Sequence, residues 1–91
     1  MGNIIRRRYT FSGRVQGVGF RYRAYHGAQQ LRLTGWVKNE WDGTVSMEVQ
    51  GTGEEFDKLI SLINKGTYVF IEKIYFKDIP LVSDERGFEV H

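Results

Sequence analysis

The sequence predicts an α+β fold from two kinds of apolar periodicity and from their order along the chain. Alternating and helical segments follow one another as β-α-β-β-α-β, with a short additional strand at the C-terminus. We expect an antiparallel sheet with both helices on one face. The chain has 91 residues, of which 41% are hydrophobic and 26% charged. This length suits one globular domain, residues 1–91, and is too short for two independent cores.

The first third of the chain changes from strand to helix periodicity at a glycine-containing loop. Residues 5–15 alternate apolar and polar side chains, which indicates a half-buried strand with Arg7 as its one exception. Residues 16–19 interrupt this alternation as a loop. Apolar side chains then recur at helical spacing, at Phe20, Ala24, Ala28 and Leu31. We expect Gly27, inside this helix, to permit close packing on the sheet.

The middle of the chain predicts two strands joined by a tight turn. Residues 35–39 form the first strand, and residues 44–50 alternate cleanly, with Val45, Met47 and Val49 on one face. Asp42-Gly43 between them is a turn signal. The two strands therefore form a hairpin.

The last third predicts a second helix and two strands. Thr52 and Glu55 have the spacing of a capping box, and Lys65-Gly66 is typical of a helix end. The buried stripe between them is Phe56, Leu59, Ile60 and Ile63. The sequence then predicts an apolar strand over residues 68–76 and a short last strand over residues 88–90. The complete order is that of a ferredoxin-like βαββαβ sandwich.

Composition excludes several classes of protein. The longest uninterrupted apolar run, residues 68–71, is four residues long, which is too short for a membrane span or a signal peptide. The chain has no cysteine, so disulfides, thiolate catalysis and thiolate metal sites are excluded. We expect a cytoplasmic protein that does not bind a membrane.

The net charge of +2 conceals a strong asymmetry along the chain. Residues 1–39 contain eight basic and no acidic residues, and residues 40–91 contain five basic and eleven acidic ones. The first segment offers a positive field to an anion. Alternatively, the acidic second half lies over it and cancels that field.

Residues 13–21 have the composition of an anion-binding loop. A strand runs into a loop that contains Gly17 and Gly19 and then opens a helix, whose first N–H groups lack partners. Arg21 in the first helical turn is electrostatically unfavourable there unless an anion lies beside it. Its guanidinium fork suits phosphate or carboxylate. A plain tight turn with Arg21 in solvent is the alternative.

Asn39 is a second candidate, near the end of the strand over residues 35–39. It shares parity with Val37, which we expect on the helix-covered face, so its amide can extend beyond the core toward the loop. An amide can donate to one oxygen and accept from a water at the same time. Alternatively, Asn39 only begins the turn, which is a common position for asparagine.

The two segments together resemble the signature motifs of acylphosphatases. These are Gly-Arg-Val-Gln-Gly-Val-Gly-Phe-Arg over residues 13–21 and Gly-Trp-Val-Lys-Asn-x-x-Asp-Gly-Thr-Val over residues 35–45. The similarity extends over essentially the whole chain, including its predicted fold. One departure is Lys65-Gly66-Thr67 after the second helix, where many members have Gly-Pro.

The resemblance implies hydrolysis of the carboxyl–phosphate bond of a small acyl phosphate, with inorganic phosphate as a product and with no metal and no cofactor. It implies that a loop and an arginine, Arg21, bind the phosphate, and that Asn39 orients the attacking water. The loop residues carried over are Gln16, Gly17, Val18, Gly19 and Phe20. We expect a monomer that binds no nucleic acid.

This chemistry agrees with the side chains available. The leaving carboxylate has a conjugate acid with a pKa of about 4, so it needs no general acid at neutral pH. No strong base is evident, and the substrate's own phosphate is a candidate to accept the proton of the water. His26 and His91 are interpreted as surface residues, too far apart in sequence for a metal motif.

Two other classes of function remain as alternatives. RNA-recognition domains share the predicted order and stack bases on the open sheet face, but the polar faces of the two predicted central strands carry no aromatic residue. A non-catalytic anion-binding domain is the second, since acylphosphatase-like domains occur in larger carbamoyl-transferring proteins. Arg6 and Arg8, on the expected open face, would contact a partner or keep the sheet soluble.

Overall fold

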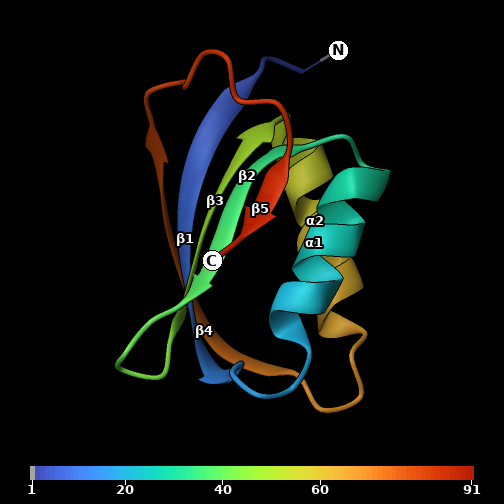
Figure 1. The fold of residues 1–91 in the computed structure, drawn as a ribbon, viewed down its shortest axis with the longest axis vertical. Coiled ribbons are helices and arrows are strands. Elements are labelled where there is room, and N and C mark those ends of the chain that lie inside the picture. The colour runs from blue at the N-terminus through green and yellow to red at the C-terminus, as the bar shows by residue number, and fades with distance from the viewer. Residues whose placement is uncertain (1) are drawn as a thin grey trace.

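The computed structural model describes residues 2–91 as a five-stranded sheet with two helices on one face (Figure 1). The elements are β1 (Ile5–Arg14), α1 (Phe20–Gln30), β2 (Thr34–Asn39), β3 (Val45–Gly51), α2 (Gly53–Asn64), β4 (Phe70–Ile79) and β5 (Phe88–Val90). The strands lie in the order β4-β1-β3-β2-β5. The predicted ferredoxin-like α+β fold is confirmed.

The direction of β5 corrects one expectation. The first four strands pair antiparallel as predicted, but β5 runs parallel to β2, with Val37 opposite Val90, so the sheet is mixed. The segment 80–87 crosses from one edge of the sheet to the other at the end where β4 finishes and β2 begins (Figure 1). A strand that follows directly from this crossing must run in the same direction as β2.

The core lies between the helices and the sheet. Alternate residues of β1, β2 and β3 point into it, and Phe11, Val37 and Met47 are fully buried there. The helices contribute Phe20, Ala24, Ala28, Phe56, Leu59 and Ile63 to the same cluster. Burial of these apolar stripes, rather than helix propensity, holds the helices on the sheet.

The ends of both helices follow local rules. In α2 the Thr52 hydroxyl accepts a hydrogen bond from the Glu55 backbone N–H, and the Glu55 carboxylate accepts one from the Thr52 N–H, which confirms the predicted capping box. The N-cap residue of α1 is instead Gly19, which has a left-handed backbone and no side chain that could cap the helix. The first N–H groups of α1 are therefore available to a ligand.

Gly27 packs against the second helix and not against the sheet as expected. A Cβ at this position would lie 2.8 Å from the Leu59 Cδ1 atom on α2. The absence of a side chain therefore lets the two helices approach one another. The contact between the two helices therefore explains the glycine at position 27, and the periodicity of the sequence does not reveal this contact.

Arg6 is the main departure from the predicted strand pattern. It lies on the face of β1 without helices, yet it is only 2% exposed. Its guanidinium donates to both carboxylate oxygens of Glu85 (2.7 and 3.2 Å) and to Glu48 (3.0 Å). The crossing segment 80–87 therefore covers this part of the sheet, and Arg6 serves neither a partner nor solubility.

Arg7 is the exception to alternation for a related reason. It points to the helix-covered side near the β4 edge, where its Nε donates to Asp78 at 2.6 Å. Its guanidinium lies 4.4 Å from the centre of the Phe76 ring. The long side chain thus covers apolar surface and keeps its charge paired at the rim.

Candidate active site

The loop between β1 and α1 borders a pocket at one end of the sheet. Gly17 (φ 71°) and Gly19 (φ 84°) both adopt the left-handed conformation that favours glycine. A Cβ at either position would meet no atom within 4 Å, so the backbone here faces open space. Both glycines line a pocket of about 180 Å³, a volume that suits a phosphoryl group with a small substituent.

The pocket brings the two candidate motifs together. Arg21 at the start of α1 and Asn39 at the end of β2 both line it, together with Val15 beneath the loop. The two strands concerned, β1 and β2, are separated by β3 in the sheet. Their loops meet because both lie at the same end of a ferredoxin-like sheet. Residues 18 positions apart in the chain therefore share one cavity.

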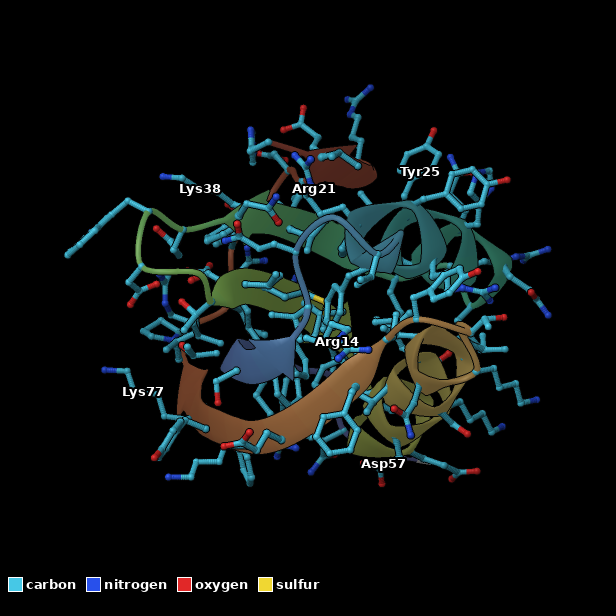
Figure 2. All side chains as sticks on the ribbon, turned by 90° about the horizontal axis from the view of Figure 1, so that it is seen from below. Arg14, Arg21, Tyr25, Lys38, Asp57 and Lys77 are labelled. Carbon is cyan, nitrogen blue, oxygen red and sulfur yellow. The ribbon has the colours of Figure 1, made fainter. Side chains whose placement is uncertain are left out.

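Arg21 is held by the chain near the C-terminus. Its Nη1 donates to the main-chain oxygen of His91 at 2.9 Å. Figure 2, viewed from the end of the molecule that carries the loop, shows Arg21 beside β5. None of the ion pairs found within residues 2–91 includes Arg21. No aspartate or glutamate side chain in this range therefore pairs with its guanidinium.

Asn39 presents an amide to the same space. It pairs with Val45 on β3 and follows the buried Val37 on the helix-covered side of β2, in agreement with the predicted parity. Within residues 2–91 its side-chain amide makes no hydrogen bond to protein that meets ordinary geometric criteria. Both its donor and its acceptor can therefore bind a ligand or a water.

The other three loop residues are Gln16, Val18 and Phe20. The resemblance assigns all three to phosphate binding, but their side chains have other contacts in the structure. Phe20 is fully buried, with its ring centre 5.0 Å from that of Phe11, and Val18 packs on the core. Phe20 lines the pocket, whereas Val18 and Gln16 are not part of its lining. The side chain of Gln16 donates instead to the main-chain oxygens of Glu40 (2.7 Å) and Thr44 (2.9 Å). Its amide therefore binds the β2–β3 turn.

Sequence reasoning missed two contributors to the site. Tyr22 lines the pocket and is 69% exposed, with its ring 4.3 Å from that of His26. The main-chain oxygen of His91 contacts Arg21, while the His91 side chain is exposed, as expected. No motif marks either residue, because an exposed tyrosine on a helix and a backbone oxygen carry no sequence signal of their own.

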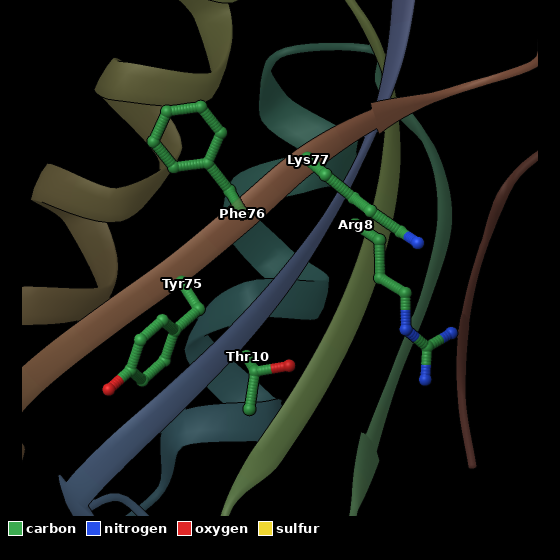
Figure 3. Close-up of a pocket in the computed structure, with 5 residues that line it drawn as sticks. All are labelled: Arg8, Thr10, Tyr75, Phe76 and Lys77. Carbon is green, nitrogen blue, oxygen red and sulfur yellow. The ribbon is translucent and has the colours of Figure 1, made fainter.

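A second hollow lies on the opposite face of the sheet, away from this site. Figure 3 shows its lining, which includes Arg8, Thr10, Tyr75 and Lys77 on β1 and β4. Tyr75 is an aromatic residue that the analysis of the two central strands did not include. The Arg8 Nη1 donates to Glu48 at 2.9 Å, so part of the positive charge on this face is already paired within the protein.

Residues 2–91 contain neither a metal-binding cluster nor a membrane-spanning helix. No group of three or more histidine, aspartate or glutamate side chains in this range is arranged to hold a metal ion. No helix in the same range is long and apolar enough to cross a membrane.

The fold and pocket thus define an α+β protein whose site brings an arginine and a side-chain amide together, and comparisons with known proteins identify its family. Residues 7–90 match the family model for acylphosphatase. An acylphosphatase of Geobacillus kaustophilus is 44% identical over 79 residues, which cover 86% of this chain and 84% of that protein. The crystal structure of acylphosphatase from Bacillus subtilis has a TM-score of 0.85 at 28% identity, covering 98% of this chain and 99% of that one. The chain belongs to the acylphosphatase family.

The same fold also occurs as part of a larger protein. The crystal structure of full-length HypF in a phosphate- and nucleotide-bound form matches with a TM-score of 0.85 and 27% identity, covering 100% of this chain but 12% of that chain. The family model and the curated relatives show that the protein is an acylphosphatase, a hydrolase that acts on acyl phosphates.

Proposed function

We propose that this acylphosphatase cleaves its substrate by direct attack of one water on phosphorus, with Arg21 and the loop of residues 16–20 holding the phosphoryl group and Asn39 orienting the water. The observation that carries the proposal is the convergence of the loop glycines, Arg21 and Asn39 on one pocket. The four other main pockets within residues 2–91 do not combine a helix N-terminus with an arginine.

Positive charge at the pocket would stabilise the phosphoryl oxygens. The N–H groups that open α1 carry a partial positive charge, and the left-handed glycines leave the loop backbone open to a ligand. The guanidinium of Arg21 adds a planar fork that matches two phosphoryl oxygens. Because these donors are already in place, they stabilise the charge of the transition state without reorganisation.

The bonds and protons of the proposed step balance without a cofactor. The water oxygen forms a bond to phosphorus, and the bond between phosphorus and the carboxyl oxygen breaks. The carboxylate leaves with the electron pair and needs no proton at neutral pH. A substrate phosphoryl oxygen takes the proton of the water, and inorganic phosphate is released. Asn39 contributes by placing the water in line with the breaking bond.

The decisive test is steady-state hydrolysis of benzoyl phosphate with EDTA present, for the wild type and Arg21→Ala side by side. We expect metal-free turnover in the wild type and a loss of about 10²-fold or more in the folded variant. Circular dichroism and thermal unfolding verify the fold. Near-normal turnover in folded Arg21→Ala would overturn the assignment of the phosphate site.

A phosphate-binding domain without turnover is the second candidate, and the match to a stretch of HypF is the observation that favours it. Tight binding of inorganic phosphate by calorimetry, with no hydrolysis of acetyl, benzoyl or carbamoyl phosphate, would support this candidate. We further propose that residues 1–91 act as one domain, as a monomer, in the cytoplasm. Size-exclusion chromatography with light scattering and cell fractionation test these points.

A further inference from the structure

Gln16 connects two loops that are distant in sequence. Its Nε2 atom donates to the main-chain oxygen of Glu40 at 2.7 Å and to that of Thr44 at 2.9 Å, across 24 and 28 residues. Both neighbours are carbonyl acceptors, so only the NH₂ end of the amide satisfies them. The two hydrogens of this group are therefore both used within the protein. Gln16 has no remaining side-chain donor for a phosphate.

The turn that Gln16 contacts is the direct continuation of the strand that carries Asn39. Its ends are joined by hydrogen bonds from the Glu40 N–H to the Thr44 oxygen (2.8 Å) and from the Gly43 N–H to the Glu40 oxygen (3.2 Å). Gln16 thus adds a second donor to each of the two carbonyls that close the turn. It is also the first residue of the loop that borders the pocket.

We propose that Gln16 is a positioning residue that fixes the distance between the phosphate loop and Asn39. The inference rests on the proposed function, in which the loop holds the phosphoryl group and Asn39 holds the water. Nothing in the sheet itself joins these two parts directly, because β3 separates β1 from β2. The Gln16 amide joins them at the pocket itself. Displacement of a reacting group by about 1 Å lowers turnover by about 10²-fold.

A double-mutant cycle between Gln16 and Asn39 tests this role. The proteins are the wild type, Gln16→Ala, Asn39→Ala and the double variant, assayed with benzoyl phosphate. We expect Gln16→Ala to lower kcat by about 10-fold or more, with the dissociation constant of inorganic phosphate changed by less than about 3-fold. In the Asn39→Ala background the same change should lower kcat by less than about 3-fold, since the group that it positions is absent.

Gln50 provides a matched control. Its side chain also makes two hydrogen bonds to main chain, accepting from the Val82 N–H (2.9 Å) and donating to the Val82 oxygen (3.0 Å), and it accepts one from the Arg6 guanidinium (3.3 Å), but all three lie on the open face of the sheet. We expect Gln50→Ala to lower the midpoint of thermal unfolding without changing kcat. A loss of stability alone therefore does not reproduce the effect of Gln16→Ala. Gln16→Glu keeps the size but replaces the donor with an acceptor, and we expect it to be no better than alanine.

Several outcomes would overturn the inference. Equal losses of kcat from Gln16→Ala in both backgrounds would show that it does not act through Asn39. A phosphate dissociation constant that rises in parallel with the loss of kcat would make Gln16 a direct ligand. If Asn39→Ala keeps full turnover, the proposed role of Asn39 fails together with this inference. If Asn39→Ala is inactive and Gln16→Ala is normal, only the inference about Gln16 fails.

Discussion

At the scale of single residues, Arg21 has an unfavourable position in the absence of ligand. A cation in the first turn of a helix opposes the helix dipole by about 0.3–1 kcal/mol, and α1 has no acidic residue in its first turn. The hydrogen bond to the main-chain oxygen of His91 restrains the guanidinium. A bound phosphoryl group would satisfy both the helix N-terminus and the guanidinium. We interpret this local cost as one accepted for function.

Arg21→Lys separates charge from geometry at this residue. Lysine keeps the positive charge but cannot donate to two phosphoryl oxygens in the plane of a fork. We expect turnover of benzoyl phosphate to fall by about 10²-fold, nearly as far as in Arg21→Ala. Arg23, two residues further along α1 and exposed, is the control. The turnover of Arg23→Lys should remain within about 2-fold of that of the wild type. Full activity in Arg21→Lys would mean that charge alone suffices.

At the scale of elements, the β2–β3 hairpin is shaped by its turn and by one glycine. Asp42 Oδ1 accepts hydrogen bonds from the Thr44 hydroxyl (2.7 Å) and the Thr44 N–H (3.1 Å), which order the turn. At Gly35 (φ 143°) a Cβ would lie 1.9 Å from the Glu48 oxygen on β3, so only glycine permits the two strands to pair there. The hairpin is therefore rigid at both ends, and Asn39 lies between them.

The turn predicts a small dependence of stability on pH. The hydrogen bonds from the Thr44 hydroxyl and N–H lower the pKa of the Asp42 carboxyl below its ordinary value of 3.8. A lowered pKa in the folded state stabilises the fold above the unfolded pKa, and this contribution is lost as the pH falls through the folded pKa. The difference in thermal midpoint between wild type and Asp42→Asn should thus be constant from pH 5 to 8 and shrink below about pH 4. Growth of this difference toward low pH would contradict the assignment.

At the scale of the whole molecule, one buried charge cluster joins the segment 80–87 to β1 and β3. The segment leaves β4, crosses the end of the sheet where β2 begins and leads into β5 beside β2 (Figure 1). Glu85 within it binds Arg6 near the start of β1. Burial disfavours the charge of Arg6, but hydrogen bonds to Glu85 and Glu48 outweigh it and raise the pKa of the guanidinium. β5 then leads to His91, whose main-chain oxygen restrains Arg21.

Glu85→Ala should therefore destabilise the protein far more than removal of a surface acid. It leaves the Arg6 guanidinium buried with Glu48 as its remaining carboxylate, and we expect the free energy of unfolding in urea to fall by about 2–3 kcal/mol. Glu54→Ala removes an exposed partner of Lys58 at 3.8 Å and should change it by about 0.5 kcal/mol or less. Equal effects of the two variants would show that the buried cluster contributes little.

The sequence predicted most of the local structure, because that structure follows from short-range patterns. The alternation over β1, the helical spacing from Phe20 and the capping box at Thr52 each depend on residues within a few positions of one another. The candidate site was accessible for the same reason, since each half of it is a short motif. Whether Arg21 and Asn39 carry the chemistry stays a prediction that the experiments above test.

Short-range patterns in the sequence account for the type and order of the elements, for the family and for the pair of motifs. The way in which distant segments meet is visible only in the folded protein: the parallel pairing of β5, the burial of Arg6 under Glu85, the packing of Gly27 against Leu59, and the hydrogen bonds from Gln16 to the β2–β3 turn. The physical reason is that each of these contacts joins residues more than 20 positions apart. A local pattern fixes which face a side chain occupies, but only the folded chain fixes what covers that face.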